Sequence, residues 1–162
     1  MHTSTDALSL WFAEALDDPA DALTAWREGS HALLPAGRRF DAVRIPVELI
    51  HAAAGGAEHD TVAEYLAVLD GPSICDPARW YYALVPPRTT ETWTCGLASC
   101  LGRGSWLTVP RPDATEHTVA GLHWCVPMEY PARLCAPGAV AALIERGHER
   151  LTPEHTPFRR PQ

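Results

Sequence analysis

The spacing of apolar residues changes along the chain between helical and strand periods, which predicts a fold built from both kinds of element. Near the N-terminus apolar residues recur every three or four positions, and this predicts a helix over residues 6–16. A second helix is expected over residues 18–29, with Asp18 as its N-cap and Pro19 in its first turn. Helical spacing returns over residues 46–55, 61–70 and 137–146, and Thr61 and Glu64 have the spacing of a capping box.

Short apolar runs bounded by Pro and Gly predict the strands. They cover residues 31–35, 40–45, 73–75, 80–85, 105–109 and 121–127. The first two are expected to form a hairpin with Gly37 in its turn. Because side chains alternate along a strand, Asp41 is expected to share a face with Val43 and Ile45. The run from Trp80 to Val85 is apolar on both faces, which is typical of a central strand.

The order of these elements predicts one α+β domain over residues 1–152, with helices packed on a mixed or antiparallel sheet. A length of 162 residues suits a single domain. Residues 153–162 are expected to form a disordered tail.

The composition narrows the classes of partner. Thirteen basic residues against twenty acidic ones give a net charge of −7, which disfavours non-specific nucleic-acid binding because such binding neutralises phosphates. No apolar run reaches the roughly 18–20 residues of a membrane span, and the first residues lack the basic start of a secretory signal. We therefore expect a cytoplasmic protein without membrane contact. The expected partners are a nucleotide or an unknown partner protein, with a homo-oligomer as a further option.

The candidate site is a glycine-flanked turn that leads into a strand. Glycine can adopt positive φ and bring the backbone close to a ligand, while the planar guanidinium between the glycines suits phosphate or carboxylate. For Trp106 two roles are open, stacking on a base and packing in the core, and we favour core packing because large aromatics dominate buried area. The predicted ligand-binding residues are Gly102, Arg103, Gly104, Ser105, Trp106 and Asp41.

Three segments carry a resemblance to a known family. They are Phe40-Asp41-Ala42-Val43, then the glycine turn Gly102-Arg103-Gly104-Ser105-Trp106-Leu107, then Gly121-Leu122-His123-Trp124-Cys125-Val126-Pro127. In order and pattern they resemble a degenerate member of the primase-polymerase superfamily, of the archaeo-eukaryotic type found as bifunctional primase/polymerase domains in bacteria. The resemblance spans roughly residues 20–150 and implies a primase-polymerase-like fold around the predicted site.

The resemblance also implies the positions of catalytic carboxylates and of a histidine, and this sequence has other residues at several of them. Two-metal nucleotidyl transfer needs several carboxylates around two cations. The second carboxylate of the family's strand corresponds to Val43, and the histidine expected near Ser105 is replaced by Trp106 or Leu107. A single carboxylate holds Mg²⁺ weakly. We therefore expect no catalytic residue, no metal and no cofactor, and we expect Asp41 to cap a turn or to pair with Arg38, Arg39 or Arg44.

These observations favour a non-catalytic primase-polymerase-like module that binds a nucleotide, a nucleic-acid end or a partner protein. One alternative is a protein-protein interaction or regulatory protein with a vestigial cleft. Another is a weak metal-dependent nucleotidyltransferase that uses Asp41 with Glu116 or Asp113.

Other chemistries fit less well. A zinc site is conceivable from the order Cys95, Cys100, His117, His123, Cys125 and Cys135, but the spacing is unlike that of structural zinc sites, so buried reduced thiols are favoured. The absence of lysine excludes a P-loop, and no hydrolase motif surrounds Ser105.

Overall fold

The computed structural model of the chain describes residues 5–116 and 119–152, and the predicted disordered tail lies outside them. The helices are α1 (Thr5–Ala13), α2 (Ala20–Arg27), α3 (Val47–Ala54), α4 (His59–Leu66) and α5 (Pro137–Leu151), with short 3₁₀ turns η1 (Ala67–Leu69) and η2 (Thr89–Glu91). The strands are β1 (Ala32–Pro35), β2 (Asp41–Pro46), β3 (Ser73–Asp76), β4 (Trp80–Val85), β5 (Ser99–Leu101), β6 (Trp106–Val109) and β7 (His123–Val126).

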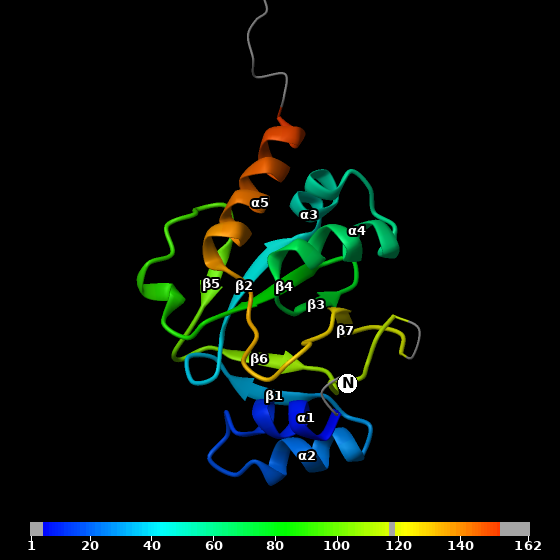
Figure 1. The fold of residues 1–162 in the computed structure, drawn as a ribbon, viewed down its shortest axis with the longest axis vertical. Coiled ribbons are helices and arrows are strands. Elements are labelled where there is room, and N and C mark those ends of the chain that lie inside the picture. The colour runs from blue at the N-terminus through cyan, green and yellow to red at the C-terminus, as the bar shows by residue number, and fades with distance from the viewer. Residues whose placement is uncertain (1–4, 117–118, 153–162) are drawn as a thin grey trace, which may run out of the picture.

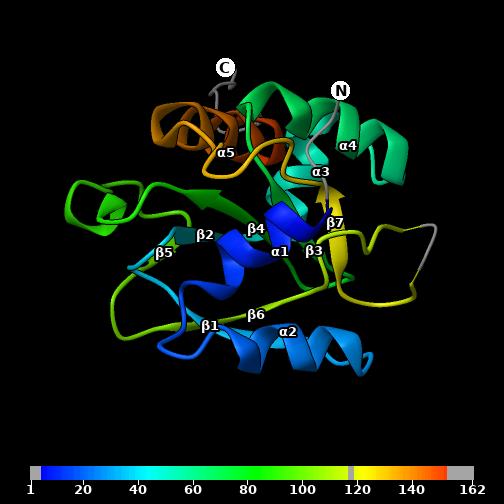
Figure 2. The ribbon, with the colours of Figure 1, turned by 60° about the horizontal axis from the view of Figure 1, so that its bottom comes forward.

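Five strands form the main sheet, in the order β5-β2-β4-β3-β7, and every neighbouring pair is antiparallel. Strand β4 is central, as its apolar content predicted, because a strand apolar on both faces must be covered on both. Helices α3, α4 and α5 lie on one side of this sheet, while α1, α2 and a small second sheet lie on the other (Figures 1 and 2). The predicted α+β class is confirmed.

The predicted hairpin between the first two strands is wrong. Strand β1 pairs antiparallel with β6, with Pro35 opposite Trp106, and these two strands form the separate small sheet. The turn at Gly37 carries the chain from this small sheet into the main one, where β2 lies between β4 and β5. Strand β2 is buried on both faces, so a central place in the larger sheet buries more of its apolar surface than a hairpin with β1.

The main sheet separates two apolar clusters. On the side of α1, the ring of Phe12 lies 5.3 Å from that of Trp124 and 6.1 Å from that of Phe40. On the other side the largest buried side chains come from β2, α3 and α5, among them Ile45, Ile50 and Ile144. The predicted alternation along β2 is confirmed, because its odd-numbered apolar residues belong to this second cluster and Ala42 belongs to the first.

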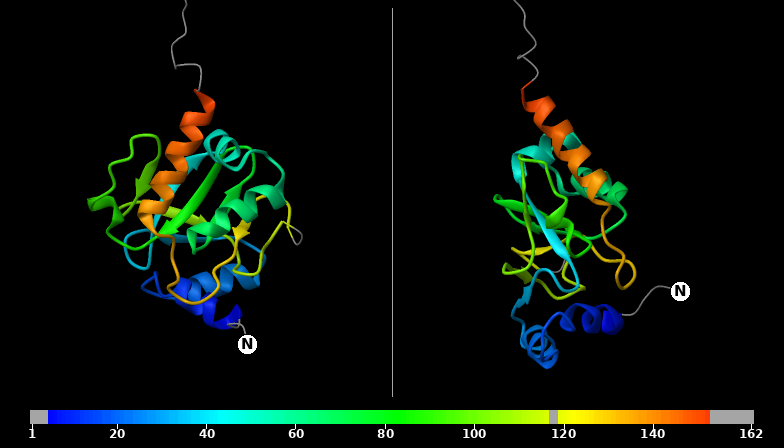
Figure 3. Two further views of the ribbon diagram at one scale, coloured as in Figure 1. Left: turned by 45° about the horizontal axis from the view of Figure 1, so that its top comes forward. Right: turned by 90° about the vertical axis from the view of Figure 1, so that its left-hand side faces the viewer.

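Local sequence signals predicted the end of α3 correctly but not the start of α4. Helix α3 ends, as predicted, at Gly55, which adopts the left-handed conformation with φ of 83°. The predicted capping box at Thr61 is wrong, because α4 already begins at His59 and the N–H of Val62 donates to the carbonyl of Glu58. The earlier start adds a turn of hydrogen bonds ahead of the buried residues Val62 and Leu66. Figure 3 shows α4 and α5 against the main sheet from two further directions. None of the described helices is long and apolar enough to cross a membrane.

Candidate functional site

A polar cavity of about 310 Å³ opens at the start of β2. Three segments that are distant in sequence meet there: the turn before β2, the 3₁₀ turn η2 after β4, and the glycine turn between β5 and β6. The cavity is lined by Gly37, Asp41, Arg88, Thr90, Glu91 and Arg103.

Asp41 is the buried acid of this cavity. Its side chain is fully buried, and its Oδ2 accepts hydrogen bonds from the backbone N–H of Thr90 at 3.0 Å and from Thr90 Oγ1 at 3.3 Å. Its Oδ1 is buried and has no hydrogen-bond partner among the described residues. Asp41 thus holds the turn η2 through Thr90, in keeping with its predicted place at a turn, and its Oδ1 is enclosed without a donor among the described residues.

The predicted ion pairs of Asp41 are wrong. Arg38 instead pairs with Asp17 at 2.9 Å and Arg39 pairs with Glu14 at 2.8 Å, both at the surface. Arg44 stacks over the ring of Trp80. These guanidinium groups lie away from Asp41 because residues 38 and 39 belong to an exposed turn, and because residue 44 lies on the opposite face of β2.

Two glycines allow the three segments to approach. A Cβ at Gly37, which has φ of 96°, would lie 2.8 Å from the Cα of Arg103, and backbone atoms cannot move aside cheaply. A Cβ at Gly102 would lie 2.6 Å from Thr90 Oγ1, the hydroxyl that donates to Asp41. The glycines therefore allow a close approach between parts of the chain itself, whereas the approach to a ligand stays a prediction.

Two arginines line the cavity, and one of them is already paired with an acid. Arg88 pairs with Glu91 at 3.2 Å, and the hydrogen bond and charge of Glu91 hold the pKa of Arg88 above its ordinary value. Arg103 is exposed, and no described residue forms a hydrogen bond or an ion pair with its side chain. The Arg103 guanidinium is therefore the cation of this cavity that is free to bind an anion.

The other predicted site residues fall around this cavity and not in it. Gly104 has positive φ of 96°, as predicted, and Ser105 completes the turn by donating its N–H to the carbonyl of Gly102 at 2.9 Å. Trp106 lines a different cavity. The predicted core packing of Trp106 is wrong, since this side chain is 54% exposed. Alternation along β6 directs Leu107 inward and its neighbour Trp106 outward.

Sequence analysis missed Arg88, Thr90 and Glu91. They belong to residues 88–99, a stretch without a helical or strand period. The available signal was the strand that precedes it, because in the sheet Asp41 lies directly opposite Val85. Residues that follow Val85 are therefore brought to Asp41 by the register of β2 and β4.

The acids considered as partners of Asp41 lie elsewhere. Glu116 lies 3.3 Å from His59 Nδ1 in another cavity, and Asp113 pairs with Arg111. Val43, which stands where the resembled family has its second carboxylate, is buried in the apolar cluster. The cavity of Asp41 thus holds one further carboxylate, that of Glu91, which Arg88 already binds.

The cavity that contains Glu116 and His59 has a volume of about 370 Å³ and also includes His123. The carbonyl of Gly121 accepts a hydrogen bond from His123 Nδ1 at 2.6 Å, and His123 Nε2 is buried without a partner among the described residues. Within residues 5–116 and 119–152, no three His, Cys, Asp or Glu side chains are grouped so that they could hold a metal ion. His117, considered for zinc, lies outside the described residues.

The cysteines are free thiols, as predicted, with Cys75, Cys125 and Cys135 buried and Cys95 and Cys100 half-buried. Burial raises the pKa of Cys125 and of Cys135 to about 12, because the low-polarity surroundings disfavour the thiolate.

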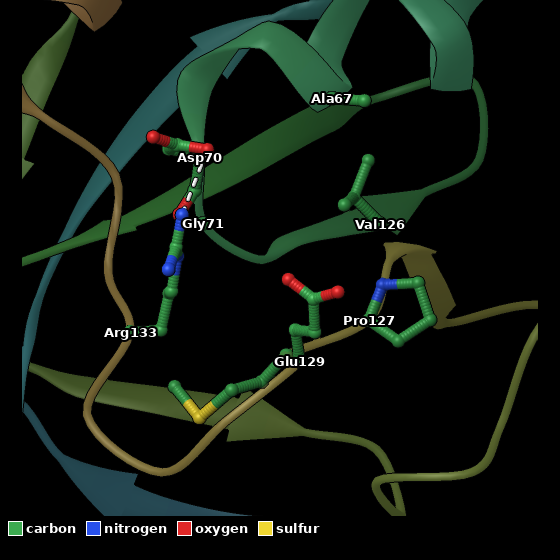
Figure 4. A pocket seen from close by; sticks show the side chains of 8 residues that line it. Ala67, Asp70, Gly71, Val126, Pro127, Glu129 and Arg133 are labelled. Carbon is green, nitrogen blue, oxygen red and sulfur yellow. Dashed lines mark hydrogen bonds and ion pairs between the residues drawn. The ribbon is translucent and has the colours of Figure 1, made fainter. Parts of the chain in front are cut away.

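A further cavity, of about 360 Å³, lies between η1 and the segment that follows β7 (Figure 4). The cation of this cavity, Arg133, is paired with Asp70 at 3.2 Å. The cavity also contains the carboxylate of Glu129. This cavity lacks, among the described residues, both the unpaired guanidinium and the buried unpartnered oxygen found beside Asp41. The Asp41 cavity is therefore the better candidate for an anionic ligand.

Comparisons of the chain with protein-family models, with curated proteins and with solved structures found no match. The structure places the chain in the α+β class, with two antiparallel sheets and a polar cavity at the start of β2 in the larger one. The resemblance to primase-polymerases remains a prediction.

Proposed function

We propose that this chain is a non-catalytic module of primase-polymerase type that binds a phosphorylated ligand, a nucleotide or the terminal phosphate of a nucleic-acid end. The observation that supports this most directly is one cavity that contains an unpaired guanidinium, Arg103, and a buried oxygen without a donor, Asp41 Oδ1. The phosphate of a nucleotide accepts from the guanidinium, and the enclosed Asp41 carboxylate forms part of the cavity's wall.

The balance of charge in the cavity favours one phosphate over a long nucleic acid. Arg88 is neutralised by Glu91, so a single cation remains for the ligand. A net charge of −7 repels a polyanion, whose binding depends on many phosphate contacts. A mononucleotide, or the end of a strand, needs only the local contact with Arg103.

The arrangement of acids supports a binding role over nucleotidyl transfer. Transfer by two metal ions requires several carboxylates to hold cations about 3.5–4 Å apart. Here Asp41 has one oxygen committed to Thr90, and Glu91 is committed to Arg88. Glu116 and Asp113 are held in other parts of the structure by His59 and Arg111.

Isothermal titration calorimetry with a nucleoside mono- or triphosphate, with and without Mg²⁺, tests the binding. We expect saturable binding that the Arg103→Ala variant weakens by about 1.5–3 kcal/mol, the contribution of a hydrogen bond to a charged group. Arg39→Ala is the matched control, because Arg39 is a surface arginine paired with Glu14, and it should leave the affinity unchanged. Equal affinity in the Arg103→Ala variant would contradict the proposal.

A template-dependent primer-synthesis assay tests the absence of catalysis separately. We expect no product with Mg²⁺ or Mn²⁺. Product formation that is abolished by Asp41→Ala, in a variant shown to be folded, would replace the binding module with a weak nucleotidyltransferase.

A further inference from the structure

A smaller cavity, of about 170 Å³, lies where β6 crosses the face of the main sheet opposite α5. Figure 2 shows β6 running along that face. The cavity shares no lining residue with the cavity of Asp41 and Arg103. It is lined by Arg44, Asp76, Tyr82, Leu101, Trp106, Leu107, Thr108 and Leu122.

The register of the main sheet explains which side chains reach this cavity. Arg44 lies opposite Tyr82, and Asp76 lies opposite Trp80, so all four project from the same face. Farther along the strands this face is covered by β1, β6 and α1, but at these positions the side chains remain only half-buried. The cavity is therefore the uncovered end of an otherwise packed sheet face.

The two charged groups of the cavity, Arg44 and Asp76, are not paired with each other. The guanidinium of Arg44 lies 4.6 Å from the centre of the Trp80 ring, a cation–π contact that limits its movement. No described residue forms a hydrogen bond or ion pair with the carboxylate of Asp76. Burial raises the pKa of Tyr82; the charge of Asp76 adds to this effect, and the charges of Arg44 and Arg79 oppose it.

Trp106 adds a flat aromatic surface. It is 54% exposed on a strand whose neighbouring residues Leu107 and Val109 are buried. Exposed aromatic side chains beside charged groups form the stacking surfaces on which proteins bind nucleobases. About half of the Trp106 side chain is open to solvent and available for such a contact.

We propose that this cavity binds a single guanine base. Trp106 stacks on the purine, Asp76 accepts from the neighbouring N1–H and N2–H groups, and Arg44 donates to O6 or N7. Guanine fits best because it presents two adjacent donors next to two acceptors. Adenine has no N1–H, and cytosine offers only its amino group to a carboxylate. Arg44 and Asp76 come from β2 and β3, the strands on either side of β4, and both line this cavity.

Calorimetric titration with guanosine, which has no phosphate, tests this inference independently of the proposed function. We expect guanosine to bind at least tenfold more tightly than inosine, which lacks the 2-amino group, and than adenosine. Asp76→Asn should weaken guanosine binding at least tenfold, because the amide nitrogen replaces one acceptor with a donor. Trp106→Ala should weaken it at least fivefold through loss of stacking.

Two controls separate this site from general effects. Tyr130→Ala removes another exposed aromatic side chain, one that does not line this cavity, and should leave guanosine affinity unchanged. Arg103→Ala should also leave it unchanged, since Arg103 belongs to the other cavity. Unchanged thermal unfolding midpoints show that the variants are folded. The absence of saturable guanosine binding at millimolar concentration, equal affinity for the three nucleosides, or indifference to Asp76→Asn would overturn the proposal.

Discussion

The backbone N–H of Thr90 donates a hydrogen bond to Oδ2 of Asp41 at 3.0 Å, and this contact joins η2 to the first residue of β2. The Thr90 hydroxyl adds a second hydrogen bond to the same oxygen at 3.3 Å. The two residues are 49 positions apart in the chain. Asp41 therefore has a structural role that does not depend on any ligand, and the candidate site is built on it.

Replacing this carboxylate should destabilise the fold. We expect Asp41→Ala to lower the free energy of unfolding by roughly 1.5–3 kcal/mol, because hydrogen bonds to a charged group contribute on this scale and the part-buried N–H and hydroxyl of Thr90 lose their acceptor. Urea denaturation measures the change. Asp41→Asn, which retains one carbonyl oxygen of the same shape, should cost less. Equal stability of wild type and Asp41→Ala would show that η2 is held by other contacts.

The close approach of Gly37 to Arg103 should make the turn before β2 intolerant of a side chain. Gly37→Ala should lower the free energy of unfolding by roughly 1–3 kcal/mol. Gly29→Ala should lower it by less. Both glycines have positive φ, so alanine introduces backbone strain at either position. Only a Cβ at Gly37 meets backbone atoms, whereas none lies within 4 Å of a Cβ at Gly29. Equal losses in thermal or urea denaturation would show that strain alone accounts for Gly37.

Much of the fold was predictable from local patterns. The central place of β4 followed from its apolar residues on both faces, and the end of α3 followed from Gly55. The pairing of β1 was not predictable in this way, because the paired residues of β6 lie 71 to 77 positions farther along the chain. Periodicity indicates that a segment is a strand, but the choice of partner depends on the packing of distant segments.

The candidate site was predictable in part for the same reason. Asp41 and Arg103 stood out as an acid on an apolar strand and a cation between glycines, and the structure places both in one cavity. The contributions of Arg88 and Glu91 depend on a 3₁₀ turn without a sequence period. The exposure of Trp106 depends on which neighbour β6 packs against, so residue type alone predicted the wrong environment.

Helix α1 should contribute to stability through one buried ring. Phe12 is fully buried between Trp124 and Phe40, so Phe12→Ala should lower the free energy of unfolding by about 3–5 kcal/mol. Leu10→Ala, on the same helix, removes a side chain that is 47% exposed and should cost far less. Urea denaturation compares the two. Similar small losses would show that α1 is not firmly packed on the sheet.

The buried thiols should make the protein less stable in alkaline solution. Burial, with a smaller effect of Asp70, raises the pKa of Cys135 from the ordinary 9.0 to about 12. Between these values the folded state keeps a proton that the unfolded state has lost. The thiol's contribution to stability is therefore complete below pH 9 and falls as the pH rises toward 12, by up to about 1.4 kcal/mol per pH unit.

Urea midpoints measured between pH 8 and 10.5 test this dependence. The Cys135→Ala variant should lose less stability per pH unit than wild type, while Cys95→Ala, at a half-buried position, serves as the control for removing a thiol. Parallel pH curves for wild type and Cys135→Ala would show that other groups cause the alkaline loss.

The crossing of α3 and α5 should depend on a glycine inside α5. A Cβ at Gly147 would collide with the carbonyl oxygen of Leu49 and lie 3.2 Å from its Cα, so the two backbones touch where a side chain would stand. Alanine favours a helix over glycine by about 1 kcal/mol, yet here the helices must separate to admit the methyl group. We therefore expect Gly147→Ala to lower the free energy of unfolding by roughly 1–3 kcal/mol in spite of its helix propensity. Gly138, in the first turn of the same helix, has nothing within 4 Å of a Cβ, so Gly138→Ala should be neutral or stabilising by up to about 1 kcal/mol. Urea denaturation measures both variants. A gain of stability in both would show that the backbones of α3 and α5 are not in contact at Gly147.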